Sequence, residues 1–124
     1  MNDRIIKRTI LVADDEQSIR ELLIACLSEY AVVTASDGAE ALDLIRATKP
    51  DLVVLDVMMP KMDGYTVCQK LKKDVSTGTI PIIMATGLGF ELNAALSQSL
   101  GAQAYITKPF DIQTLLKTVE RLLP

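Results

Sequence analysis

Five polar residues stand at the ends of short apolar runs in this sequence. Asp14 and Asp15 close the first run, and Asp56 closes the third. Thr86 and Lys108 close the fourth and the fifth. Carboxylates suit Mg²⁺, and a carboxylate beside such a metal can attack phosphorus and form an aspartyl phosphate. Because a hydroxyl and an ammonium can stabilise the oxygens of the transferring group, these residue types favour Mg²⁺-dependent phosphoryl transfer.

The apolar runs are typical of strands buried on both faces of a parallel sheet. They are short and rich in Val, Ile, Leu and Ala. The predicted strands are residues 9–13, 31–35, 52–55, 81–85 and 104–107. A helical pattern follows each strand, and three of these helices have an aspartate as a candidate N-cap, namely Asp37, Asp63 and Asp111.

Two of the predicted helices carry more specific expectations. The first should bury one stripe with helical spacing, made of Ile19, Leu22, Leu23, Cys26 and Leu27. The fourth, residues 90–100, has the least regular apolar pattern, and Gly101 is expected to close it. Cys26 and Cys68 both fall on apolar helix positions, which favours buried free thiols over a disulfide or a metal site.

Strands that alternate with helices predict an α/β fold with helices on both faces of the sheet. Right-handed crossovers leave the flavodoxin-like (βα)5 order 2-1-3-4-5 as the natural doubly wound topology for five strands. In that order strands one and three are neighbours, so Asp14, Asp15 and Asp56 should converge at the carboxyl edge of the sheet. Thr86 and Lys108 should leave strands four and five at the same edge.

Composition excludes several other classes of protein. The chain has 124 residues, of which 49% are hydrophobic and 23% are charged, as expected for one compact domain over residues 1–124. No apolar run has the length of a membrane span or of a signal-peptide core, so a cytoplasmic location is expected. A net charge of −3 disfavours direct nucleic-acid binding, and the absence of histidine excludes catalysis by that residue.

Each site residue also has an ordinary structural interpretation. Asp14 or Asp15 could cap the first helix, and Asp56 could be a loop residue. Thr86 could be a strand-end hydroxyl, and Lys108 could pair with any carboxylate. The functional interpretation is favoured because these residue types occupy the exits of four different strands.

The same residues carry a resemblance to a known family. The chain resembles the receiver domain of bacterial two-component response regulators over essentially its whole length. The similar motifs are ILVADDE at 10–16, DLVVLDVMMPKMDG at 51–64, PIIMAT at 81–86 and GAQAYITKPF at 101–110. Each motif is modest alone, but the four in this order and at these spacings are highly specific.

The resemblance implies that Asp56 accepts a phosphoryl group from a sensor histidine kinase or a histidine phosphotransfer protein. It implies that Asp15 binds Mg²⁺ directly and that Asp14 does so largely through water, with Mn²⁺ or Ca²⁺ as substitutes. Asp56 and the backbone carbonyl of Met58 would complete the protein ligands.

The resemblance also implies a switch. Thr86 and Lys108 would contact the phosphoryl oxygens, and Tyr105 would turn inward as the Thr86 hydroxyl moves toward the phosphate. The change would remodel the face formed by the fourth helix, fifth strand and fifth helix, where a partner or a second copy could dock. The Lys108–Pro109 bond is expected to be cis, which would direct the lysine into the site.

Some positions depart from the commonest family pattern. Gly87 and Gly89 stand where other residues are more usual, which predicts a mobile loop after Thr86. Met58 and Leu88 stand at the positions that flank the phosphoryl group, and both are apolar. Because they can exclude water and cannot orient it, we predict slow autodephosphorylation.

The residues favour a signalling switch that catalyses only its own phosphorylation and slow dephosphorylation over two other classes of function. A haloacid-dehalogenase-type phosphohydrolase would use a second Asp two positions after Asp56 as its acid/base, and Met58 stands there. A scaffold that is never phosphorylated would be favoured by loss of a site residue, and none is lost. No effector segment is expected within this chain, so the output would pass to a partner protein or to an output domain outside it.

Overall fold

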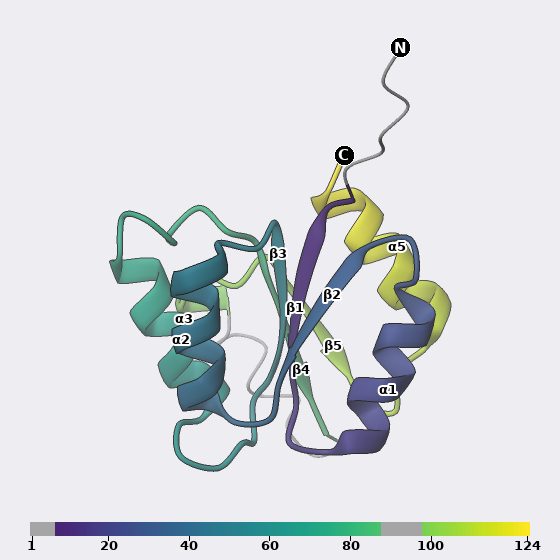
Figure 1. Cartoon of the computed structure of the whole chain (residues 1–124), viewed down its shortest axis with the longest axis horizontal. Coiled ribbons are helices and arrows are strands. Elements are labelled where there is room, and N and C mark those ends of the chain that lie inside the picture. Colours follow the sequence, from purple (N-terminus) through teal and green to yellow (C-terminus); the bar gives the residue numbers. More distant parts are fainter. Residues whose placement is uncertain (1–6, 88–97) are drawn as a thin grey trace.

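The computed structural model describes residues 7–87 and 98–124, which form a parallel sheet flanked by helices (Figure 1). The strand order is β2-β1-β3-β4-β5, and every neighbouring pair is parallel. This confirms the predicted flavodoxin-like fold. The strands are β1 (Thr9–Ala13), β2 (Ala31–Ala35), β3 (Leu52–Asp56), β4 (Ile82–Thr86) and β5 (Ala104–Thr107).

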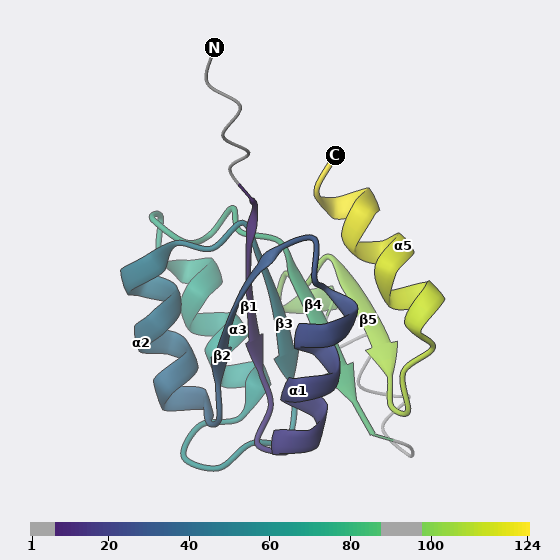
Figure 2. The same ribbon diagram turned by 45° about the vertical axis from the view of Figure 1, so that its right-hand side comes forward.

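Helices cover both faces of the sheet, as Figures 1 and 2 show. One face carries α1 (Gln17–Cys26) and α5 (Ile112–Leu122). The other carries α2 (Gly38–Thr48) and α3 (Gly64–Lys73). The predicted helix at 90–100 lies outside the described residues except for its last three positions. None of the helices in the described ranges has the length and apolar character that a membrane span needs.

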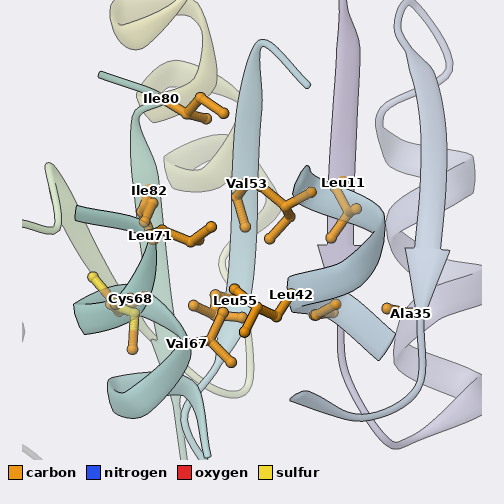
Figure 3. Packing of buried hydrophobic residues seen from close by; sticks show 14 of the residues in the cluster. Leu11, Ala35, Leu42, Val53, Leu55, Val67, Cys68, Leu71, Ile80 and Ile82 are labelled. Atoms are coloured by element: carbon orange, nitrogen blue, oxygen red, sulfur yellow. The ribbon is translucent and has the colours of Figure 1, made fainter. Parts of the chain in front are cut away.

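Two hydrophobic cores hold the helices on the sheet. In the core under α2 and α3, side chains such as Leu42 and Val67 pack against Val53 and Leu55 of β3 (Figure 3). In the core under α1 and α5, Leu23 and Leu115 pack with residues of the opposite sheet face. Because β1, β3 and β4 are covered on both sides, their sequences are continuous apolar runs and not alternating ones.

The predicted helix N-caps are confirmed. The carboxylates of Asp37 and Asp63 accept hydrogen bonds from the backbone N–H groups of Glu40 and Thr66, each at 2.8 Å. Asp111 accepts from the N–H groups of Gln113 and Thr114. Each carboxylate therefore satisfies N–H groups that have no partner inside the helix.

The predicted apolar stripe of α1 is partly wrong. Leu23 and Leu27 are buried, but Leu22 is 41% exposed and Cys26 is only half-buried. Helical spacing places these positions on one side of α1, but it does not say how far the covered stripe extends. Cys68 is buried as expected, and both thiols are free.

Candidate functional site

Strand register brings the predicted site residues to one edge of the sheet. Ala13 is paired with Leu55, so the next residues, Asp14 and Asp56, leave β1 and β3 at the same level. Thr86 is paired with Thr107, so Lys108 leaves β5 beside the end of β4. Parallel strands thus place these groups around one crevice, as expected for the switch point of a doubly wound sheet.

Lys108 connects two buried carboxylates. Its Nζ lies 2.6 Å from Oδ2 of Asp14 and 3.3 Å from Oδ2 of Asp56. The side chains of Asp14 and Asp56 are 3% and 5% exposed. The Lys108 backbone N–H donates to the Thr86 carbonyl, and the Lys108–Pro109 bond is cis as predicted. One ammonium faces two carboxylates, so a negative charge remains uncompensated.

Burial and this excess of negative charge both disfavour the ionised form of Asp56. Burial, together with the charge of Asp14, raises the pKa of Asp56 from 3.8 to about 6. The Lys108 ammonium and the Met58 backbone N–H oppose this rise without cancelling it. Burial alone would lower the pKa of Lys108, but its contacts with Asp14 and Asp56 outweigh burial and raise it. Lys108 is therefore a firmly charged cation, whereas Asp56 carries an anion that the site stabilises poorly.

An acidic cluster beside Asp56 fits a divalent cation. Carboxylate oxygens of Asp14, Asp15 and Glu16 all lie within 4.8 Å of one another. Asp14 is buried, and its Oδ1 accepts a hydrogen bond from the Glu16 backbone N–H at 2.9 Å, whereas Asp15 and Glu16 are exposed. A cavity of about 260 Å³ opens at this place and is lined by Asp15, Glu16, Asp56, Met58, Gly87 and Lys108. Hard oxygen ligands around a space open to water are the setting that Mg²⁺ prefers.

Glu16 was not among the predicted site residues. It follows Asp14 and Asp15 directly, so its acidic character was visible in the sequence. Its position was not, because it depends on the sharp turn that leads from β1 into α1. The alternative interpretation, in which Asp14 caps the first helix, is wrong. The N-cap of α1 is Glu16, and the Asp14 carboxylate accepts the N–H group of Glu16 itself, before the helix begins.

Thr86 ends β4 with a side chain that is almost fully buried. The residue is 1% exposed, and its Oγ1 has no hydrogen-bond partner in the part of the chain that the structure describes. Buried hydroxyl groups without a partner are rare and call for an explanation, such as a ligand that is bound only part of the time. Tyr105, on the neighbouring strand β5, is half-buried and lines a cavity of about 310 Å³ with Phe110 and Thr114.

The loop after Asp56 folds back tightly over β3. A Cβ atom on Gly64 would lie 2.2 Å from the Asp56 carbonyl oxygen, so only glycine permits this approach. The Val57 N–H donates to Ala85, and the Gly64 N–H donates to Val57. Met58 is 59% exposed and lines the cavity beside Asp56. Leu88 and Gly89 lie outside the described residues.

Fold and site together define a doubly wound α/β domain with a cluster of acidic side chains at the carboxyl edge of its sheet. The family model of the response regulator receiver domain matches residues 10–120, and this chain belongs to that family. Receiver domains are signalling domains, and Mg²⁺ binding is typical of them.

Several individual proteins are similar to this chain. It is 50% identical over 119 residues to the probable transcriptional regulator ycf27 of Cyanophora paradoxa, a match that covers 94% of this chain and 48% of that protein. It is 45% identical over 120 residues to the alkaline phosphatase synthesis transcriptional regulatory protein PhoP of Bacillus subtilis (strain 168), covering 95% and 49%. The chain thus spans about half the length of these curated relatives. Among solved structures, the chemotaxis protein CheY4 of Vibrio cholerae matches with a TM-score of 0.86 at 32% identity, covering 94% of this chain and 98% of that one.

Proposed function

We propose that residues 1–124 act as a single receiver domain in which Asp56 is the phosphoacceptor of a signalling switch. The observation that carries the proposal is the environment of this carboxylate. Asp56 is buried at the end of β3, 3.3 Å from the Lys108 ammonium, and opens onto a cavity with acidic walls. A buried anion with incomplete compensation is expected where a nucleophile meets an electrophile and a metal.

The chemical step needs little from the protein beyond positioning and charge. With a pKa of about 6, Asp56 is ionised at neutral pH, so a carboxylate oxygen is free to attack phosphorus. A new O–P bond forms, the P–N bond of a phosphohistidine donor breaks, and its electron pair stays on the imidazole nitrogen. The Lys108 ammonium then faces the phosphoryl oxygens. The Thr86 hydroxyl, which has no hydrogen-bond partner among the residues that the structure describes, donates a hydrogen bond to one of them.

A bound Mg²⁺ ion would supply positive charge against the carboxylates and the phosphoryl oxygens. Asp14, Asp15, Asp56 and the Met58 carbonyl would hold it, with Glu16 beside them. The uncompensated charge between Asp14, Asp56 and Lys108 supports this assignment, since a cation relieves it.

Phosphorylation would act on the rest of the domain through Thr86. When the buried hydroxyl turns toward the phosphoryl group, it vacates volume behind β4, and Tyr105 turns inward to fill it. The affected face would be the one formed by the fourth helix expected from the sequence together with β5 and α5, and an effector, an output domain or a second copy would dock there. A sensor histidine kinase or a histidine phosphotransfer protein is the proposed donor, as expected for the response regulator family.

Intact mass spectrometry after incubation with acetyl phosphate tests the proposal. The expected result is one phosphoryl adduct that requires Mg²⁺ and is absent in Asp56→Asn. Asp63→Asn is the matched control, because Asp63 caps α3 seven residues later and asparagine caps equally well. An adduct that persists in Asp56→Asn, or no adduct at any Mg²⁺ concentration, would reject Asp56 as the phosphoacceptor.

A further inference from the structure

We propose that Gly38, at the start of α2, is a positioning residue for the metal-binding loop between β3 and α3. This inference rests on the proposed function, because that loop carries the Met58 carbonyl assigned above as a Mg²⁺ ligand. The sequence predicts Asp37 as the N-cap of a helix, and Gly38 is the residue that follows it. In the structure, the turn that contains them also supports the loop of residues 57–63.

The contact between Gly38 and the loop is made by backbone atoms on both sides. A Cβ atom on Gly38 would lie 1.8 Å from the Met62 carbonyl oxygen and 2.6 Å from its carbonyl carbon. The Gly38 N–H also donates to the Pro60 carbonyl at 3.4 Å. The loop therefore rests directly on the helix start, and any side chain larger than hydrogen would push it away.

The support that Gly38 offers is rigid. The Asp37 carboxylate accepts the Glu40 N–H at 2.8 Å, and the Glu40 carboxylate accepts the Ser36 N–H at 2.7 Å. These two bonds form a reciprocal cap like the capping box, which fixes the first turn of α2. One residue earlier, the Ala35 carbonyl accepts the backbone N–H of Asp14 at 3.1 Å. The same short turn thus touches the loops that carry both halves of the metal site.

Further contacts hold the loop against this support. Lys61 adopts a positive φ of 69°, and its ammonium lies 3.5 Å from the Asp37 carboxylate. The side chains of Met59 and Met62 pack on the core under α2 and α3. Met58 points outward and is 59% exposed, so its backbone position depends on the anchored residues that follow it.

Gly38→Ala isolates this role. The Met62 carbonyl would have to move by more than ~1 Å, a displacement large enough to matter for ligand geometry. Alanine is the better helix former, so a loss of function could not be assigned to a weaker α2. Gly78→Ala is the matched control, because Gly78 lies in the turn between α3 and β4, at the opposite edge of the sheet. Its added Cβ would lie 3.1 Å from the Asp74 carbonyl oxygen, a close contact that a shift of only a few tenths of an ångström relieves.

The experiment measures Mg²⁺ affinity by calorimetry without a phosphodonor, and then the labelling rate with acetyl phosphate at saturating Mg²⁺. Gly38→Ala should weaken Mg²⁺ binding by about tenfold or more, the usual effect of disturbing residues behind metal ligands, and should slow labelling. Gly78→Ala should bind Mg²⁺ within about twofold of the wild-type protein. Equal Mg²⁺ affinity in Gly38→Ala and wild type would overturn the inference.

A measurement on the wild-type protein decides the matter if Gly38→Ala does not fold. Saturating Mg²⁺ should slow hydrogen exchange at the Gly38 amide, because the metal would immobilise the loop whose Pro60 carbonyl accepts that hydrogen. Slower exchange at Met58 with no change at Gly38 would show that the loop responds to metal independently of the turn. Failure of the wild-type protein to bind Mg²⁺ or to be labelled would instead reject the proposed function, so the two failures are distinguishable.

Discussion

Replacement of the phosphoacceptor Asp56 by asparagine should stabilise the domain at neutral pH. Burial and the charge of Asp14 raise the pKa of Asp56 to about 6 from 3.8, despite the partial compensation by Lys108. The folded state therefore disfavours the ionised carboxylate that exists above this pKa. Asparagine has nearly the same shape and carries no charge, so it removes this destabilisation.

The pKa shift sets the size of the effect and its pH range. A difference of about two pKa units corresponds to roughly 3 kcal/mol in the free energy of unfolding. Because the folded-state pKa of Asp56 is the higher one, ionisation of this group costs the wild-type protein no stability below about pH 4, and the cost reaches this amount as the pH rises above about 6. The stability advantage of Asp56→Asn should thus be near zero below about pH 4 and reach its maximum above about pH 6.

Urea unfolding of both proteins without Mg²⁺ measures this difference in the free energy of unfolding. The measurements run from pH 3.5 to 8 in steps of about half a pH unit. Asp63→Asn serves as the control, since Asp63 is an exposed cap, and it should change stability by less than about 0.5 kcal/mol. The electrostatic account of this site would be refuted if Asp56→Asn and wild type had the same free energy of unfolding at pH 7.5. It would also be refuted if the difference between them did not shrink toward pH 4.

Three further substitutions test individual parts of the site. Met58→Asn should speed loss of the phosphoryl group by roughly tenfold, because an amide can orient water where Met58 excludes it; an unchanged decay of the adduct mass would contradict slow hydrolysis. Lys108→Met should tighten Mg²⁺ binding about fivefold in calorimetry, because it removes a cation that lies 2.6 Å from Asp14, and it should slow labelling by acetyl phosphate. Weaker Mg²⁺ binding would argue against competition between the Lys108 ammonium and Mg²⁺. Thr86→Val should raise the free energy of unfolding by about 1 kcal/mol, because it removes a buried hydroxyl that has no partner in the described part of the chain. A loss of stability in urea would mean that the hydroxyl is bonded in solution.

The sequence was sufficient to predict the strand order and the convergence of Asp14, Asp56 and Lys108. These residues leave short apolar strands, and parallel topology brings the ends of such strands to one edge. The α1 stripe was less predictable, because periodicity identifies a side of the helix and not how much of it the rest of the fold covers. Leu22 lies beyond the covered part and is exposed.

Residue patterns did not reveal the close contacts between backbone segments around the site. Gly38 and Gly64 directly follow the helix N-caps Asp37 and Asp63 in the sequence, yet each also makes room for a backbone carbonyl group, that of Met62 for Gly38 and that of Asp56 for Gly64. In each such contact the glycine contributes no side chain, so the sequence carries no sign of it. A glycine that allows a close approach of another backbone segment looks in the sequence like a glycine in an ordinary turn, and only the folded structure distinguishes the two.

Locating the phosphoryl group by peptide mapping after reaction with acetyl phosphate and Mg²⁺ tests the central claim most directly. The account predicts a single modified peptide that contains Asp56, formed only when Mg²⁺ is present. A modification at another residue, or one that forms equally well without Mg²⁺, would contradict it.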